Sequence, residues 1–285
     1  MSTRAARLAL FSAIEPGANF WIREISTLGV EEVCERIKHQ AYDPIKYSKI
    51  ISEVSQFNLD KFETELAMHG ATCITPENDC WPTQLEHLIN PPLALIVKGR
   101  IESLTQRSLA IVGTRNPTPY GIRIAGDFAA GFVDREWSIV SGGAYGIDTA
   151  AHRGALVAEG CTVAVIASGI DSPYPSGNTR LFAEIMENGA IVSEVALGVP
   201  ALPHRFLTRN RLIAGLAQST LVVEAAFRSG SLRTARDAAE LMRPVMAIPG
   251  PINSPSSEGC HRLIGERAAE LVTSVADALE LISAL

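Results

Sequence analysis

The chain has 285 residues, of which 47% are apolar and 20% charged, and a formal net charge of −6. This composition supplies enough apolar material for one large core or two ordinary ones, and it excludes a surface that is basic throughout. A local group of arginines can still bind phosphate on such a chain. No apolar run approaches the about 20 residues that a membrane helix needs, and the start of the chain lacks the apolar stretch of a secretory signal. We therefore expect a cytoplasmic protein without a membrane span.

The five cysteines are scattered, and none has metal-ligand spacing to another cysteine or to a histidine. Cys260 and His261 are adjacent, which is poor geometry for two ligands of one ion. The sequence thus predicts reduced thiols and no metal site.

The first 70 residues predict a small all-α domain. Apolar residues recur there at helical spacing, as in Trp21, Ile25 and Leu28, and glycines such as Gly70 end the helices. A linker at 71–92, broken by Pro91 and Pro92, leads into a second domain that runs to residue 285. The predicted domains are therefore 1–70 and 71–285, the second including the linker.

From residue 93 onward, short β-branched runs alternate regularly with helical patterns. This alternation is typical of a doubly wound α/β domain with a mostly parallel sheet. We expect a short strand at 73–75 and a second strand that starts with residues 93–97. Further strands are expected at about 108–112, 138–141, 162–167, 190–193, 220–224 and 245–248.

Two successive strand–loop–helix units span residues 108–148. Thr118 and Pro119 favour a helix start after the first loop, which also contains Arg115, and Ser141-Gly142-Gly143 follows the second strand. Adjacent helix N-termini present N–H groups that attract anions. We expect this edge of the sheet to bind phosphate. The glycine-rich turn either contacts a phosphate or serves packing alone.

A cluster of cations follows at 203–214, which we place before a helix. Guanidinium groups can grip phosphates, and an adjacent aromatic ring can stack on an unpaired base. Alternatively, an arginine pairs with Glu194 or Glu224, and the phenylalanine belongs to the core. The residues concerned are Arg205, Phe206, Arg209 and Arg211.

A third loop, Ser229-Gly230-Ser231, precedes a helix that Ser231 can cap; it either presents N–H groups to an anion or forms an ordinary capped turn. No catalytic motif is present, and the first loop is neither GxGxxG nor a Walker A loop. Asp148 and His152 lie four residues apart on one helix, which favours a buried structural pair over an acid–base couple. The sequence predicts no enzyme and no cofactor.

The chain from about Trp81 to Glu280 resembles the DNA-processing protein A (DprA/Smf) family. The resemblance rests on many motifs in one order, among them Ile111–Arg115, Ser141–Asp148, Ala151–Leu156, Tyr174–Asn178, Phe206–Gly215, Val222–Ala225, Ser229–Ala235, Ile248–Gly250 and Gly259–Ile264. Leu207 replaces a usual proline, and Arg233 stands where an apolar residue is usual. The helical start is compatible with the family's SAM-like domain, and the C-terminal winged helix of many members is absent from this sequence.

This resemblance implies a non-enzymatic protein with an extended Rossmann-like domain that binds single-stranded DNA, protects it and loads the RecA recombinase on it during natural transformation. It also implies a homodimer formed through the Rossmann domain. Phosphates would follow an edge formed by Arg115, Arg209 and Arg211. Motifs and resemblance together predict nucleic-acid binding by Gly113, Arg115, Ser141, Gly142, Gly143, Arg205, Phe206, Arg209, Asn210, Arg211, Ser229 and Arg233.

The alternative is a nucleotide-binding or nucleotide-hydrolysing protein related to the cytokinin-riboside phosphoribohydrolases. Those enzymes carry a Pro-Gly-Gly loop with an acidic residue. The comparable loop here, 229–235, lacks that residue, which favours the strand-binding interpretation.

Overall fold

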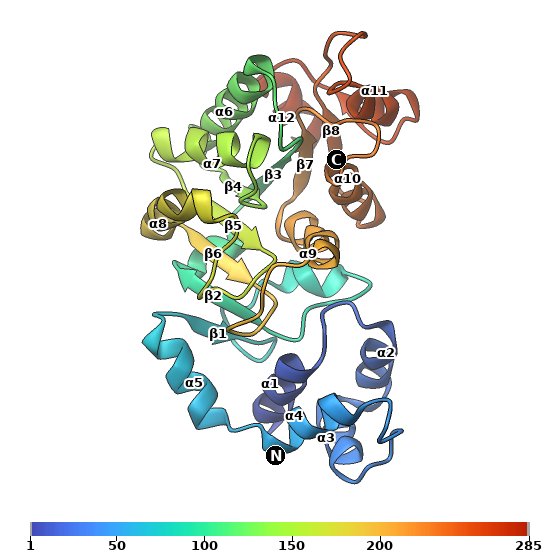
Figure 1. Cartoon of the computed structure of the whole chain (residues 1–285). Coiled ribbons are helices and arrows are strands. Elements are labelled where there is room, and N and C mark those ends of the chain that lie inside the picture. Colours follow the sequence, from blue (N-terminus) through green and yellow to red (C-terminus); the bar gives the residue numbers. More distant parts are fainter. Residues whose placement is uncertain (1, 284–285) are drawn as a thin grey trace.

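A computed structural model describes residues 2–283 and shows one nine-stranded sheet in the order β1-β2-β6-β5-β4-β3-β7-β8-β9 (Figure 1). The strands run parallel from β6 to β9, whereas β1 and β2 pair antiparallel at one end. Their bounds are β1 Thr72–Ile74, β2 Leu95–Gly99, β3 Ser108–Val112, β4 Ser138–Ser141, β5 Thr162–Ile166, β6 Ala190–Ser193, β7 Ser219–Val222, β8 Val245–Ala247 and β9 Glu270–Leu271.

The predicted α/β class and its strands are confirmed. Central strands such as β3 and β5 are buried along their whole length, because helices cover both faces of the sheet. The prediction missed β9, which has only two residues, both exposed, and no β-branched run to signal it.

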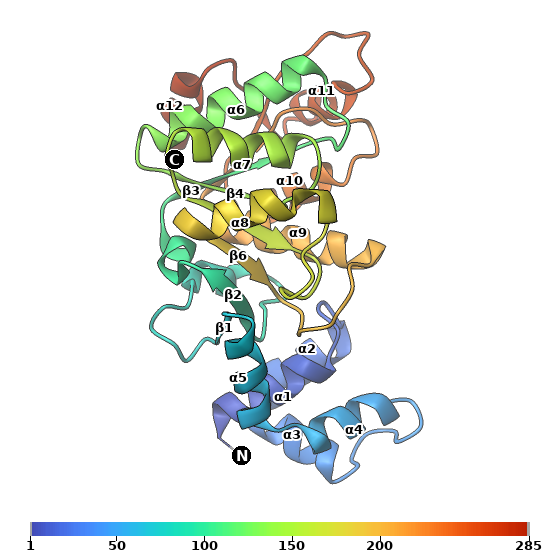
Figure 2. The ribbon, with the colours of Figure 1, turned by 60° about the vertical axis from the view of Figure 1, so that its left-hand side comes forward.

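Helices on the first face cover the strands in a row, which Figure 2 shows for α6, α7 and α8. The second face carries the other helices and a 3₁₀ turn. The first group is α6 Pro119–Val133, α7 Ile147–Val157, α8 Thr179–Asn188 and α12 Val275–Ser283; the second is α9 Pro203–Leu216, α10 Ser231–Glu240, α11 Glu258–Gly265 and η1 Thr83–His87.

The N-terminal region is helical, as predicted. Four helices surround a separate apolar core that includes Leu10, Trp21 and Ile37, and a fifth leads into β1. The region lies at one end of an elongated molecule (Figure 1). The helices are α1 Thr3–Ala13, α2 Asn19–Leu28, α3 Val30–Lys38, α4 Ser48–Gln56 and α5 Leu59–Met68. Across the described range 2–283, no helix is long and apolar enough to span a bilayer.

The direction of winding reverses once. From β3 the chain proceeds through β4 and β5 to β6, and α9 then carries it back to β7 on the other side of β3. In doubly wound sheets, a crevice opens beyond the carboxyl ends of the strands where the order reverses, here between β3 and β7. That crevice is where ligands of such folds bind.

Candidate nucleic-acid interface

A cleft of about 740 Å³ lies at this reversal point. It is formed by the loops after β3 and β7 and by the first turns of α9. Six of the predicted binding residues line it: Gly113, Arg115, Phe206, Arg209, Asn210 and Ser229. Tyr174 and Arg228 line it as well, although neither was among the predicted binding residues. Tyr174 belongs to the motif Tyr174–Asn178, and both residues lie in loops at the same sheet edge.

Arg115 and Phe206 form the accessible centre of the cleft. The Arg115 guanidinium lies 4.8 Å from the centroid of the Phe206 ring, and the edge of Tyr174 meets this ring at a centroid distance of 5.7 Å. Arg115 and Arg228 are exposed, and no carboxylate of residues 2–283 lies within 4.0 Å of either guanidinium. Two unpaired cations and two aromatic rings therefore face one space.

The predicted position of the arginine cluster before a helix is wrong, because the cluster lies inside α9. The helix begins with Pro203 at its first turn, where the lack of an N–H has no cost. At 100° per residue, a helix turns Arg211 to nearly the opposite side from Arg209. Arg205, Arg209 and Arg211 consequently do not form a single cationic surface.

Arg211 pairs with Glu194 away from the cleft. Its Nη2 donates to Oε1 of Glu194 at 2.5 Å, and the two side chains are only 10% and 9% exposed. Burial raises the pKa of Glu194, while the Arg211 charge opposes that rise. The structural alternative considered for Arg211 from the sequence is thus the one observed.

Arg209 lines the cleft but is buried. Its Nη1 donates to the carbonyl of Val165, and Asp148 faces it across Gly142. A methyl group at Gly142 would lie 2.3 Å from Nη1 of Arg209 and 2.6 Å from Oδ2 of Asp148, so only glycine fits. Burial lowers the pKa of Arg209 to about 10 and raises that of Asp148.

Asp148 and His152 do not form the predicted pair. His152 instead bonds Thr162 through Nδ1, at 2.7 Å from Oγ1, whereas Asp148 accepts from the backbone N–H of Ala144. Burial lowers the pKa of His152 to about 3, so the ring is neutral at physiological pH. The spacing correctly indicated burial but not the partners.

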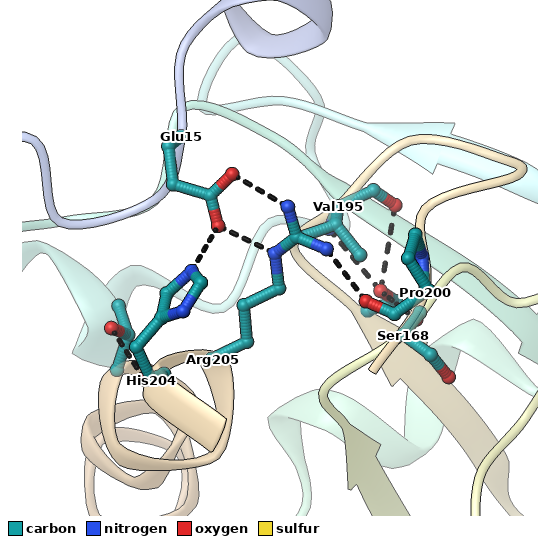
Figure 3. Close-up of polar contacts among 8 residues, drawn as sticks. Glu15, Ser168, Val195, Pro200, His204 and Arg205 are labelled. Atoms are coloured by element: carbon teal, nitrogen blue, oxygen red, sulfur yellow. Dashed lines mark hydrogen bonds and ion pairs between the residues drawn. The ribbon is translucent and has the colours of Figure 1, made fainter. Parts of the chain in front are cut away.

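Arg205 joins α9 to the N-terminal helices, as Figure 3 shows. Its Nε and Nη2 donate to Glu15 at 2.5 and 2.8 Å, and Nη1 donates to the carbonyl of Pro200. His204 approaches the same carboxylate at 3.2 Å. Hydrogen bonding from Arg205 is the main reason why the pKa of Glu15 lies below its usual value. Arg205 and Glu15 lie 190 residues apart in the chain, and no sequence signal joins them.

The N-terminus of α6, predicted to attract a phosphate, is occupied by a protein carboxylate. Glu224 accepts from the backbone N–H and the hydroxyl of Thr118 at 2.9 and 2.7 Å. A methyl group at Gly121 would lie 2.2 Å from its Oε2. The turn thus binds an anion, as the sequence pattern indicated, but this anion is a carboxylate of the chain itself and not a phosphate.

Several other predicted residues lie away from solvent or from the cleft. Ser141, Gly142 and Gly143 are buried around Asp148. Arg233 donates to Asp237 one turn along α10 at 2.7 Å and does not line the cleft. Ser231 does not cap α10; instead the Ser229 hydroxyl accepts from its backbone N–H.

The chain thus defines a Rossmann-like α/β protein with a cationic, aromatic cleft at its reversal point. It belongs to the family described as DNA recombination-mediator protein A, whose model matches residues 72–283. A putative DNA processing protein DprA of Mycobacterium tuberculosis is 41% identical over 264 residues, which cover 85% of this chain and 68% of the relative.

Among the solved structures that share this fold are two proteins of the same name from other bacteria. DNA processing protein A from Streptococcus pneumoniae superposes with a TM-score of 0.82 at 32% identity, covering 98% of both chains. The Helicobacter pylori protein, described for its single-stranded DNA binding mode, gives a TM-score of 0.67 at 30% identity and covers 74% of this chain and 95% of its own.

Proposed function

We propose that this chain binds single-stranded DNA in the cleft and acts as a recombination mediator that protects the strand and passes it to the RecA recombinase during natural transformation. The observation that carries the proposal is the Arg115–Phe206 pair, with the exposed Arg228 in the same cleft. Family membership and the strand binding described for the H. pylori relative support it.

The arrangement suits a strand rather than a duplex. Arg115 and Arg228 are available to phosphates, and the half-buried ring of Phe206 offers a surface for an unpaired base. Base stacking requires a face that duplex DNA does not expose. We therefore expect little sequence preference, since every base has such a face.

A nucleotide-hydrolysing function has less support. The Gly-rich turn at 141–143 and the α6 N-terminus, which would receive nucleotide phosphates, already surround the carboxylates of Asp148 and Glu224. Within the part of the chain that the structure describes, the lining of the cleft includes a single acidic residue, the buried Asp148. A hydrolase of this fold would need an accessible carboxylate as base.

The first test compares a labelled oligothymidylate with duplex DNA of the same length at two salt concentrations. We expect tight binding of the strand that weakens steeply with salt, because phosphate contacts release counterions. Equal affinity for duplex, or no binding of either, would contradict the proposal. In the latter case, hydrolysis of small nucleotides is the assay to run.

Dimerisation through the Rossmann-like domain is a further part of the proposal. Two clefts on one strand would bind with far higher avidity than one, because the second contact is intramolecular. RecA loading is tested separately, by following RecA filament assembly on strands already coated by a single-strand binding protein.

We predict that Arg205 affects strand binding indirectly, by anchoring the first turn of α9, which carries Phe206. Glu15→Gln and Arg205→Ala should then weaken binding alike, by about 2- to 5-fold, since a partly exposed ion pair is worth up to about 1 kcal/mol. Neither should change the salt dependence measured by fluorescence anisotropy. If Arg205 touched phosphate directly, only Arg205→Ala would flatten that dependence.

A further inference from the structure

A second aromatic–arginine pair lies beside the cleft, next to the lining residues Ala226 and Arg228. Phe227 belongs to the loop after β7, and the Arg262 guanidinium of α11 lies 4.7 Å from the centroid of its ring. The Arg115–Phe206 distance is 4.8 Å, so the two pairs have nearly the same geometry. The predicted site included neither Phe227 nor Arg262, although Arg262 lies within the motif Gly259–Ile264.

Phe227 is accessible to a ligand. It is 49% exposed although it is a large apolar residue, and its neighbours Ala226 and Arg228 line the cleft. Arg262 is held in place by an Nε contact of 2.6 Å to Glu266. A ring supported on one face by a fixed cation can receive a base on its exposed surface.

We propose that Phe227, supported by Arg262, is a second stacking site for a base of the same single strand. The inference rests on the proposed function and extends it. One base stacks at Phe206, the phosphates between contact Arg115 and Arg228, and a base farther along stacks at Phe227. The strand is thereby fixed at both rings.

The test uses oligothymidylates from about 4 to about 20 nucleotides, a range that brackets common single-strand site sizes. Phe227→Ala should weaken binding of the long strands by about 5- to 150-fold, the usual effect of losing one aromatic–base contact. It should leave strands too short to reach both rings unchanged. Phe227→Trp should restore the affinity for long strands.

A control and a direct readout complete the design. Val157→Ala removes another exposed apolar side chain, at the end of α7, and should bind like wild type. Strands with one 5-iododeoxyuridine should crosslink to Phe206 and to Phe227 from different positions, located by mass spectrometry.

The outcomes separate this inference from the function on which it rests. If the wild type binds long strands and Phe227→Ala binds them equally, with crosslinks at Phe206 alone, the second site is refuted and the proposed function stands. A length-independent loss in Phe227→Ala that Phe227→Trp does not restore also refutes it. A wild type that binds no strand overturns both.

Discussion

Glu194→Ala should lower the free energy of unfolding by about 3–5 kcal/mol, as expected when one partner of a buried ion pair is removed. Among residues 2–283, Nε and Nη1 of Arg211 already have no hydrogen-bond partner, and the substitution would leave the entire guanidinium unpaired in the interior. Urea unfolding at neutral pH measures the change.

Glu184→Ala is the matched control. Glu184 also pairs with an arginine, Arg180, but both side chains are exposed, so the loss should not exceed about 0.5 kcal/mol. The double variant Glu194→Leu/Arg211→Met should recover most of the stability, because apolar residues of similar volume can replace a buried pair. The double variant should also bind single strands like wild type. A clear loss of binding would mean that Arg211 contacts the strand after all.

Arg115→Ala should weaken single-strand binding by about 10- to 150-fold, which corresponds to about 1.5–3 kcal/mol for a hydrogen bond to a charged group. The slope of log affinity against log salt should become shallower by about 0.7, the value for one phosphate contact on a single strand. Anisotropy titrations at several salt concentrations give both quantities.

Arg135→Ala serves as the control for charge. Arg135 is exposed just after α6, at the opposite edge of the sheet, and its Nη1 donates to the carbonyl of Gly131. Its removal lowers the net charge equally and should leave affinity and slope close to wild type. Equal effects of the two variants would mean that binding is driven by overall charge and would place the strand elsewhere.

The sheet could be predicted from the sequence because its strands are short β-branched runs between loops, and such runs are local signals. The helix α9 could not be predicted over its full length. Arg209, Asn210 and Arg211 are consecutive polar residues, and all three are buried. The sequence of α9 is therefore not divided into an apolar face and a polar face, which is the pattern by which a helix is usually predicted. The cluster therefore looked like a loop.

The location of the cleft followed from the order of strands and loops, whereas the partners of its charges did not. Glu15, Glu194 and Glu224 each bind a group distant in sequence, and spacing carries no information about such contacts. A contact could be predicted where its two residues are close in sequence, as with the cap that Thr118 forms on α6. A contact could not be predicted at the N-terminus of α6, where folding brings the distant Glu224 carboxylate into a turn that the sequence offers to phosphate.

Those internal carboxylates also determine which anions can compete for the protein. The two turns that could enclose the phosphates of a free nucleotide, at 141–143 and at the N-terminus of α6, already hold the carboxylates of Asp148 and Glu224. What remains open is a set of single cations, each too weak to retain one small anion. Only a ligand of high valency can add many such contacts together. If the proposed function holds, we therefore expect the protein to bind a polynucleotide in preference to the free nucleotides around it.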